Sequence, residues 1–349
     1  METVRFGIIG CGGISPWHAN AVKVHPNARL AAVSDLDAAR AEAFARQFDV
    51  PLHTTADAIL ESPDIDAVCI CTPSGMHASL ALRALAGGKH VVVEKPLAIT
   101  PESLDEVLEA ERKYTFPGGP QLCAVSQMRS LPDVLRAREI LQNNGIGDVT
   151  LADLSMKYYR DPSYYAQSSW RGTFAGDGGG ALMNQGIHGA DLLCFLCGDI
   201  KAVYARKKTL AHRIETEDTL CADFELKSGG LGVLTAATAC YPGFKRRLEI
   251  CGADGSLTLN EGKLASIEMR GKAVNEKADA DTPAAKSSAS DPFNMDMQPH
   301  AVQIGEFTDC ILAEKPYANN AAEAARALKL IFAIYRSAEC GTPVEVKEF

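Results

Sequence analysis

The sequence predicts an α/β protein of two domains: an N-terminal domain with a parallel sheet, and an α+β domain with a large, open, mainly antiparallel sheet. Its 349 residues exceed one small core, because single domains commonly hold about 100–200 residues. The first 115 or so residues alternate short apolar runs with segments of helical period, which indicates βαβ units. From Asp148 onward strand-like runs dominate, with a few helical segments between them.

The N-terminal elements follow from this alternation. Pro101 with acidic residues after it is typical of a helix start. The run Phe116–Pro120, rich in Pro and Gly, interrupts the pattern and predicts a domain boundary near residue 122, giving domains 1–122 and 123–349. Strands are expected at Val4–Ile9, Leu30–Ser34, Asp66–Cys71, His90–Val93 and Leu122–Ser126, and helices at Pro16–Val24, Asp37–Phe48, His77–Ala86 and Pro101–Tyr114.

In the second domain, helices are expected from Leu131 to Leu141, at Gly186–Leu196, and at about 299–313 and 321–339. The last of these is a candidate to pack back on the first domain. The polar segment 272–292 is expected to be a surface loop. Strands are expected at Val149–Tyr158, Lys201–Lys207, Thr219–Leu226, Gly232–Ala239, Arg247–Cys251 and Ser256–Leu259.

Composition excludes several classes of function. A net charge of -9 argues against a broad basic face for nucleic acid. No apolar run approaches the roughly 20 residues that cross a membrane. The 11 cysteines are scattered and odd in number, and no leader peptide is evident, so we expect a reducing cytoplasm. Neither Cys69–Cys71 nor Cys194–Cys197 has a second pair at zinc-ligand spacing, so we expect no metal site.

The segment Gly10-Cys11-Gly12-Gly13-Ile14-Ser15 follows a predicted strand and opens a predicted helix. That context is the one in which a glycine-rich fingerprint binds a dinucleotide. Gly10 permits the tight turn, Gly12 lets the backbone approach a pyrophosphate, and the helix N-terminus supplies N–H donors. The first domain is therefore predicted to be a Rossmann domain.

Asp35 ends the second strand, where an acid would accept hydrogen bonds from the adenosine ribose. Its charge would repel a ribose phosphate, so NAD is favoured over NADP. The positive charge of Arg40 would instead favour the ribose phosphate of NADP. The alternative interpretation is a glycine-rich turn with an unrelated surface aspartate, and the spacing of the two features favours the cofactor.

Two further strand ends carry unusual residues. Thr72-Pro73-Ser74, with His77 close behind, follows the third main strand, and Glu94-Lys95-Pro96 follows the fourth. Ligands of parallel α/β sheets bind at the carboxyl ends of the strands, so both loops should face the cofactor. Lys95 is placed to donate a hydrogen bond to a substrate hydroxyl or to relay its proton. Taken alone, a solvated surface lysine and a helix-start histidine are the better interpretations of Lys95 and His77.

Together these motifs resemble the Gfo/Idh/MocA family of sugar and cyclitol oxidoreductases. The resemblance extends through a later glycine-rich run, Gly178–Asp191, to the closing segment Ser337–Val344, so it covers essentially the whole chain. It implies an NAD-dependent dehydrogenase in which His188 is the general base and Lys95 its hydrogen-bonding or relay partner. Imidazole has a suitable pKa for removing a hydroxyl proton as hydride leaves. The cofactor-binding residues so implied are Gly10, Gly12, Gly13, Ile14, Asp35, Arg40, Thr72, Pro73, Ser74, His77, Glu94 and Lys95.

The resemblance also indicates a substrate class. Trp170-Arg171-Gly172-Thr173 and the glycine-rich run look most like members that oxidise pyranose rings at C3, including UDP-sugar and glycoside dehydrogenases. Asn184 stands where many cyclitol-oxidising members carry an aspartate, which makes an inositol dehydrogenase a weaker reading. The expected substrate-binding residues are Asn184, Asp191, Trp170, Arg171 and Tyr159. For Asp191, an ordinary helix carboxylate is an equal alternative. For Tyr159, the alternative is a place in a subunit interface of a homodimer or homotetramer.

Three functions remain open on the sequence. The first is a dehydrogenase acting on a sugar, glycoside or sugar nucleotide. The second is an enzyme that cleaves glycosides by transient oxidation and recycles its NAD. The third is an NAD-binding sensor without catalytic activity, against which the presence of both Lys95 and His188 argues.

Overall fold

The computed structural model describes residues 2–115, 118–271 and 297–346. The expected surface loop at 272–292 lies outside these residues. The chain divides into two compact units. The first contains Met1–Gln127 and Asp296–Ala325, and the second contains Met128–Met295 and Arg326–Phe349. Helix α10 (Gln298–Leu312) therefore belongs to the first unit, although it follows most of the second unit in the sequence.

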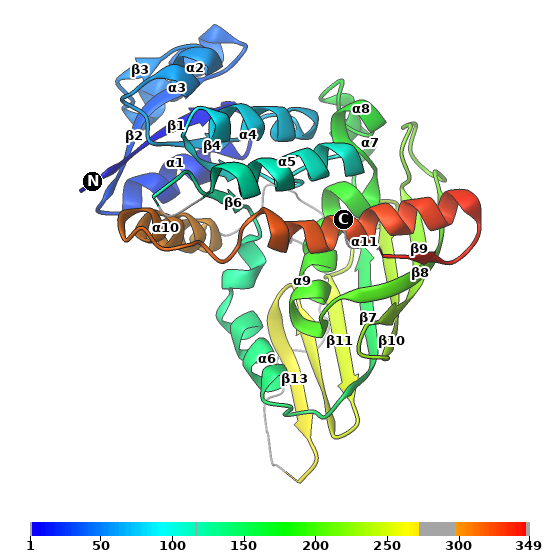
Figure 1. The fold of residues 1–349 in the computed structure, drawn as a ribbon. Coiled ribbons are helices and arrows are strands. Elements are labelled where there is room, and N and C mark those ends of the chain that lie inside the picture. The colour runs from blue at the N-terminus through cyan, green and yellow to red at the C-terminus, as the bar shows by residue number, and fades with distance from the viewer. Residues whose placement is uncertain (1, 116–117, 272–296, 347–349) are drawn as a thin grey trace. The chain divides into compact units, whose positions relative to one another are not determined.

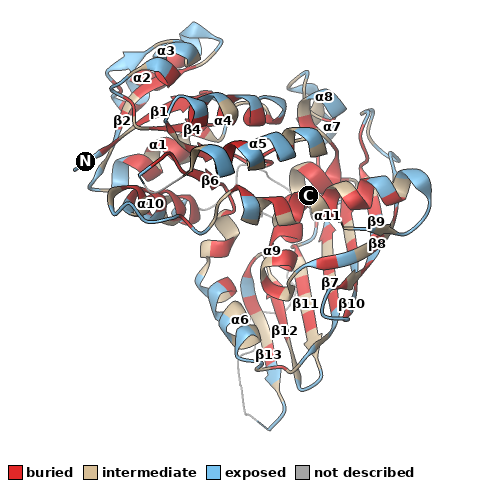
Figure 2. Ribbon diagram, in the orientation of Figure 1, coloured by how far each residue is buried: buried red, intermediate tan, exposed pale blue. Residues whose placement is uncertain are grey.

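The first unit is built on a six-stranded parallel sheet with the strand order β3-β2-β1-β4-β5-β6. Its central strands are buried along their length (Figure 2), as expected where helices cover both faces of a parallel sheet. The strands are β1 (Val4–Ile9), β2 (Ala28–Ser34), β3 (Leu52–His53), β4 (Ala67–Ile70), β5 (His90–Val93) and β6 (Leu122–Ala124).

The helices of the first unit begin at recognisable caps. Asp37 accepts hydrogen bonds from Ala39 and Arg40 at the start of α2, and Thr100 and Ser103 form a capping box before α5. Helices α1 and α10 pack together, as do α4 and α5 (Figure 1). The helices are α1 (Ser15–Val24), α2 (Ala38–Phe48), α3 (Ala56–Glu61), α4 (His77–Ala86), which follows the short 3-10 helix η1 (Ser74–Met76), α5 (Pro101–Tyr114) and α10 (Gln298–Leu312).

The second unit is built on an eight-stranded sheet with the order β13-β12-β11-β7-β10-β9-β8-β14. β7 and β10 run parallel, and the other neighbouring pairs are antiparallel. β7 alternates buried and solvent-facing residues, which is the pattern of a sheet covered on one face. The strands are β7 (Val149–Lys157), β8 (Ile200–Lys208), β9 (Thr219–Leu226), β10 (Leu231–Ala237), β11 (Arg247–Gly252), β12 (Gly255–Asn260), β13 (Lys263–Met269) and β14 (Val344–Glu345).

Helix α9 lies against the sheet of the second unit and is almost entirely buried (Figure 2). The segment before it, η3, is a π-helix, an uncommon form that is frequent at functional sites. Helix α11 continues from the first unit into the second. The helices are η2 (Gln127–Ser130), α6 (Pro132–Gln142), α7 (Pro162–Ala166), α8 (Phe174–Asp177), η3 (Ala181–Gly186), α9 (Ile187–Cys197) and α11 (Ala321–Cys340).

The predicted fold class is confirmed: a parallel α/β sheet is followed by a mixed, mainly antiparallel one. Sequence analysis missed the short elements β3, α3, α7 and α8 and the strand β13. β3 has only two residues, both exposed, so it carries no hydrophobic period. β13 has buried Leu264 and Ile267 at a spacing that a bulge interrupts. None of the described helices is long and apolar enough to span a membrane.

Candidate functional site

The glycine-rich loop of the first unit has the geometry that its sequence predicts. Gly10 has a φ of +95°, and a Cβ atom there would lie 2.6 Å from the backbone oxygen of Cys71. At Gly12 a Cβ would meet nothing within 4 Å. Gly13 is exposed, and Ile14 is the residue that precedes α1. Gly10 is therefore required by the fold, whereas the open side of Gly12 is available to a ligand.

Asp35 links the end of β2 to this loop. Its carboxylate accepts hydrogen bonds from the backbone N–H groups of Cys11 and Asp37, both at 2.9 Å. The Arg40 guanidinium lies 3.5 Å from the same carboxylate and is half exposed. A carboxylate has about four acceptor positions, so Asp35 can still accept bonds from ribose hydroxyls. Burial raises the pKa of the Cys11 thiol to about 12, which keeps that side chain neutral.

The residues present fit a dinucleotide. The Oγ1 atom of Thr72 is buried and has no hydrogen-bond partner among the described residues, so it is available to a ligand. It lies on the loop that Gly10 contacts closely, together with Pro73 and buried Ser74. Helix α1 begins directly after the glycine-rich loop and presents its N–H groups there. NAD would therefore be held by Gly12, Gly13 and Ile14 at its phosphates and by Asp35 at its ribose.

His77 joins the two loops that follow β4 and β5. Its Nδ1 atom lies 2.8 Å from the carbonyl oxygen of Pro96, and its Nε2 atom lies 2.8 Å from that of Thr72. The side chain is buried, and burial lowers its pKa, although the two carbonyl groups and Glu94 oppose that shift. His77 thus fastens the Lys95 loop to the Thr72 loop, and its contact with the cofactor stays a prediction.

Glu94 is buried beside two histidines, and Lys95 follows it on the surface of the loop. The Nε2 atom of His18 lies 2.8 Å from Glu94 Oε1, and that of His300 lies 3.4 Å from the same oxygen. The backbone N–H of Lys95 donates to Glu94 Oε2 at 3.2 Å. Lys95 precedes a cis peptide bond to Pro96 and is partly buried. Glu94 thus holds the backbone of Lys95, whose part in the chemistry stays a prediction.

In the second unit, the glycine-rich run forms the π-helix η3 and the first turn of α9. Glu217 accepts hydrogen bonds from the N–H groups of Gly180 and Leu182, each at 2.9 Å, and from the Tyr335 hydroxyl at 2.9 Å. Tyr335 also accepts from the N–H of Met183 at 3.1 Å. These contacts hold the segment that carries Asn184. His188 lies half-buried in the first turn of α9.

A chain of polar contacts fixes the Asn184 amide. Its Nδ2 donates to buried Asp177 at 2.7 Å, and its Oδ1 accepts from Gln185 Nε2 at 3.0 Å. Gln185 also donates to the Tyr164 hydroxyl at 3.2 Å and accepts from Arg160 at 2.8 Å. A small pocket is lined by Asn184, Asp177, Gln185 and Tyr164, among others. The pocket has room for about one water molecule, and the hydrogen bonds around it hold the Asn184 amide in a fixed orientation.

Arg171 lies beside this pocket. Its guanidinium stacks on the Tyr164 ring at 4.5 Å and lies 5.2 Å from the Trp170 ring. The Nε atom is buried and makes no hydrogen bond within the described part of the chain. Tyr159 contacts Tyr241 edge-to-face at 5.2 Å. The structure brings Arg171 and Asn184 together around Tyr164, and a contact of Tyr159 with substrate stays a prediction.

Asp191 is buried in an ion pair with Arg129. Arg129 Nε donates to Oδ2 at 2.9 Å, and one terminal nitrogen donates to Oδ1 at 2.6 Å. Arg129 also lies over the Phe195 ring at 4.8 Å. Both oxygens of Asp191 therefore have a protein partner, and its contact with substrate stays a prediction.

Sequence reasoning missed Asp177 and Glu217, which organise the site of the second unit. Asp177 precedes the glycine run by one residue, and a conspicuous acid next to three glycines is a signal that could have found it. Glu217 lies in a stretch of several acids, Glu215–Asp218, and nothing local distinguishes it. The expected absence of a metal site also stays a prediction, since ligand atoms of His18, Glu94 and His300 lie within 4.8 Å of one another.

Two family models match the chain. One, described as an oxidoreductase family with an NAD-binding Rossmann fold, matches residues 4–116. The other, described as the GFO/IDH/MocA C-terminal domain, matches residues 134–258. An inositol 2-dehydrogenase of Rhizobium meliloti is 30% identical over 276 residues, which cover 76% of this chain and 78% of that protein.

Two solved structures match over nearly the whole chain. The WlbA dehydrogenase of Chromobacterium violaceum, in complex with NADH and UDP-GlcNAcA, is 28% identical with a TM-score of 0.86 and covers 100% of this chain and 97% of its own. The WlbA dehydrogenase of Bordetella pertussis, with the same ligands, is 26% identical with a TM-score of 0.86, and the match covers 99% of this chain and 100% of that one.

Proposed function

Because this chain belongs to the Gfo/Idh/MocA family and is an NAD-dependent dehydrogenase, we propose that its substrate is a sugar, glycoside or sugar nucleotide with a pyranose ring, oxidised at C3. The observation that carries the proposal is the match of the whole chain to two dehydrogenases whose structures contain NADH and UDP-GlcNAcA. The Asn184 amide, held by Asp177 and Gln185, supports a substrate with hydroxyl groups, because an amide can both donate to and accept from a hydroxyl.

Bound NAD supplies the hydride acceptor. The chain supplies the proton chemistry: a secondary alcohol becomes a ketone when the carbinol carbon loses hydride and the hydroxyl loses its proton. His188 accepts that proton, because a neutral imidazole is a base near neutral pH. Lys95 donates a hydrogen bond to the same oxygen and stabilises its developing charge. Asn184 cannot take up a proton, so it orients the substrate through its amide.

Arg171 favours an acidic sugar as the substrate. The guanidinium is held by stacking on Tyr164, with one buried nitrogen left without a partner in the described structure. A guanidinium pairs with carboxylate or phosphate in bidentate fashion, so a uronate or sugar nucleotide is favoured over a neutral glycoside. We further infer a cytoplasmic homodimer or homotetramer, on the resemblance to the family alone.

The test is a substrate panel with NAD at high enzyme concentration, followed by the absorbance of NADH. The panel holds UDP-sugars, free uronates, glycosides and inositols, because curated relatives include inositol 2-dehydrogenases. We expect a rise with UDP-uronates or uronates and none with Lys95→Met or His188→Gln. Reduction of NAD by inositols alone would overturn the substrate class.

A flat trace with every compound would point to another reaction of the same fold. Cleavage of a glycoside without net NADH would then identify the NAD-recycling enzyme. Neither product nor NADH, together with tight NAD binding, would identify a sensor.

A further inference from the structure

A buried cluster of one carboxylate and two imidazoles lies behind the Lys95 loop. We call Glu94, His18 and His300 the Glu94 cluster. Their side chains are 7%, 0% and 2% exposed. They come from three separate elements of the first unit: the end of β5, helix α1 and helix α10. An acid buried to this degree must be paired and hydrogen-bonded if it is to stay ionised.

The two carboxylate oxygens of Glu94 have different contacts. Oε1 lies 2.8 Å from His18 Nε2 and 3.4 Å from His300 Nε2. Oε2 accepts the backbone N–H of Lys95 at 3.2 Å. An ionised carboxylate only accepts, so His18 presents its proton at Nε2. Burial raises the pKa of Glu94, but the two histidines outweigh it and hold that pKa well below its usual range.

The other titratable groups around Glu94 do not replace these partners. The thiols of Cys69, Cys71 and Cys123 lie on neighbouring strands, and burial raises the pKa of each, so they remain neutral. His77 lies near Glu94 but is engaged with the carbonyl groups of Pro96 and Thr72. The His18 imidazole is thus the hydrogen-bond partner of Oε1, and the His300 imidazole lies beside the same oxygen at 3.4 Å without a hydrogen bond in the described part of the chain.

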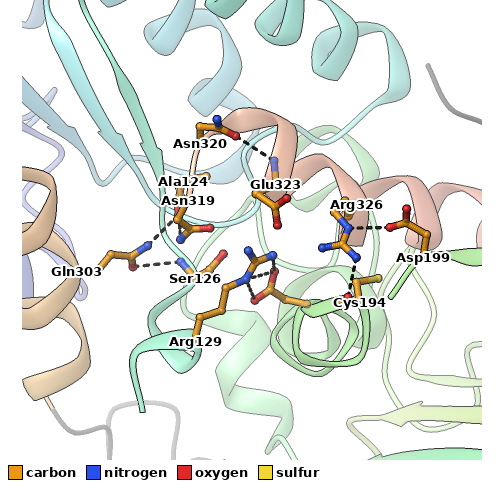
Figure 3. A network of polar contacts seen from close by, with 11 residues as sticks. Ala124, Ser126, Arg129, Cys194, Asp199, Gln303, Asn319, Asn320, Glu323 and Arg326 are labelled. Atoms are coloured by element: carbon orange, nitrogen blue, oxygen red, sulfur yellow. Dashed lines mark hydrogen bonds and ion pairs between the residues drawn. The ribbon is translucent and has the colours of Figure 1, made fainter. Parts of the chain in front are cut away.

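Helix α10, which carries His300, is itself fixed to the sheet of the first unit by hydrogen bonds. Gln303, one turn further along this helix, accepts a hydrogen bond from the N–H of Ser126 at 3.2 Å and donates to the carbonyl of Ala124 at 3.1 Å. Figure 3 shows these two bonds at the end of β6, with Asn319 donating to the same Ala124 carbonyl. Gln303 therefore fastens the helix that carries His300 to the edge strand of the sheet.

We propose that His18 and His300 are positioning residues, which keep Glu94 ionised so that its second oxygen fixes the backbone of Lys95. The catalytic part of this proposal rests on the proposed function, because it takes Lys95 as the group that contacts substrate. The placement of Glu94 between the imidazoles of His18 and His300 and the backbone N–H of Lys95 stands without it. Two histidines separated by most of the chain thereby support one catalytic loop.

A metal ion is the competing occupant of the cluster, since its three ligand atoms lie within 4.8 Å of one another. The Nδ1 atoms of His18 and His300 are buried without a hydrogen-bond partner in the described part of the chain. Imidazoles that bind metals almost always donate from the second ring nitrogen to an acceptor. The missing acceptors at Nδ1 and the short His18–Glu94 contact favour a hydrogen-bonded His18–Glu94 pair, with His300 Nε2 3.4 Å from Oε1 and without a hydrogen bond in the described part of the chain.

The first experiment needs no turnover. Infrared difference spectra, assigned with Glu94→Gln, report whether Glu94 is ionised at neutral pH. We expect an ionised carboxylate in the parent protein and a protonated carboxyl in His18→Leu. His18→Gln retains an N–H donor near the position of Nε2, so we expect it to restore the ionised form. A carboxylate that stays ionised in His18→Leu, or a stoichiometric metal in the purified parent protein, would overturn the proposal.

The second experiment measures turnover on the substrate found above. We expect His18→Leu and His300→Leu to lower kcat about tenfold or more, with KM nearly unchanged and the acid limb of the pH profile moved to higher pH. The Gln variants should recover most of kcat.

His25→Gln is the matched control, because His25, the residue that follows α1, also pairs with α10, through Asp309 at 3.2 Å. Equal losses in this control would show a merely structural role. If the infrared spectra show the expected ionised Glu94 but the Lys95→Met variant is active, the proposed function is refuted and the proposal for the Glu94 cluster stands.

Discussion

Arg129 and Asp191 face each other in a bidentate ion pair, with side chains 7% and 8% exposed. Breaking one partner of such a buried pair leaves an uncompensated charge and typically costs about 3–5 kcal/mol. We expect Asp191→Asn to destabilise the protein by a cost of this order, measured by urea unfolding. Arg129→Met combined with Asp191→Leu should recover much of the loss, since an apolar replacement removes both charges. Stability losses that simply add in the double variant would show that the pair does not act as a unit.

The two glycines of the phosphate loop should respond oppositely to alanine. Gly10→Ala forces a side chain into a positive-φ position against the Cys71 backbone, so we expect a loss of about 2 kcal/mol or more in unfolding free energy. Gly12→Ala places its methyl group in open space, so we expect unchanged thermal stability but at least about tenfold weaker NADH binding. NADH fluorescence and thermal melts of both variants check this. Normal NADH affinity in folded Gly12→Ala would show that the cofactor does not approach that face.

Asp35 should determine the preference for NAD. Loss of a charged acceptor typically costs about 1.5–3 kcal/mol, so Asp35→Ala should weaken NADH binding about 10- to 100-fold. The difference in affinity between NADH and NADPH should become smaller. Asp37→Asn is the control, because it keeps the oxygen that caps α2. Titration of both cofactors against the three proteins decides the point. Tighter binding of NADPH than of NADH by the parent protein would contradict this role for Asp35.

His90 should make the protein sensitive to acid. Its Nδ1 accepts a hydrogen bond from the N–H of Gln121 at 3.1 Å, and burial lowers its pKa to about 4 from the ordinary 6.5. The unfolded chain therefore binds a proton between these values that the folded chain does not, and stability falls as the pH falls through this window. The loss should reach up to about 3 kcal/mol.

Unfolding free energies measured from pH 7 to pH 4 should show a shallower decline for His90→Asn than for the parent protein. His53→Asn, at an exposed position, is the control and should follow the parent. Parallel curves for all three proteins would show that His90 does not carry this sensitivity.

The elements that bury apolar runs were the predictable part of the fold. His77–Ala86, His90–Val93 and Pro101–Tyr114 have the expected bounds, because periodicity and local caps coincide there. β3 could not be predicted, since two exposed residues join the sheet only through their backbone. The π-helix could not be predicted either, because its form depends on contacts with Glu217 and Tyr335 far along the chain.

The candidate site divides in the same way. The phosphate loop was predictable because its glycines, helix start and Asp35 are close in sequence. The partners of Asp191 and Glu94 were not, since Arg129, His18 and His300 carry no local pattern that separates them from ordinary surface or core residues. Long-range pairing of buried charges is a property of the packed chain and leaves no local pattern.

The order of strands in the second sheet has a consequence for biosynthesis. β7 is made before β8 and β9, yet its neighbours in the sheet are β10 and β11, which emerge from the ribosome later. The first unit is also incomplete until α10 has been made, because α10 packs on α1 and β1. Non-local pairing of this kind slows folding and leaves apolar strands exposed in the meantime. We expect nascent chains that end before β10 to bind chaperones through β7, and release to follow once β10 and β11 are synthesised.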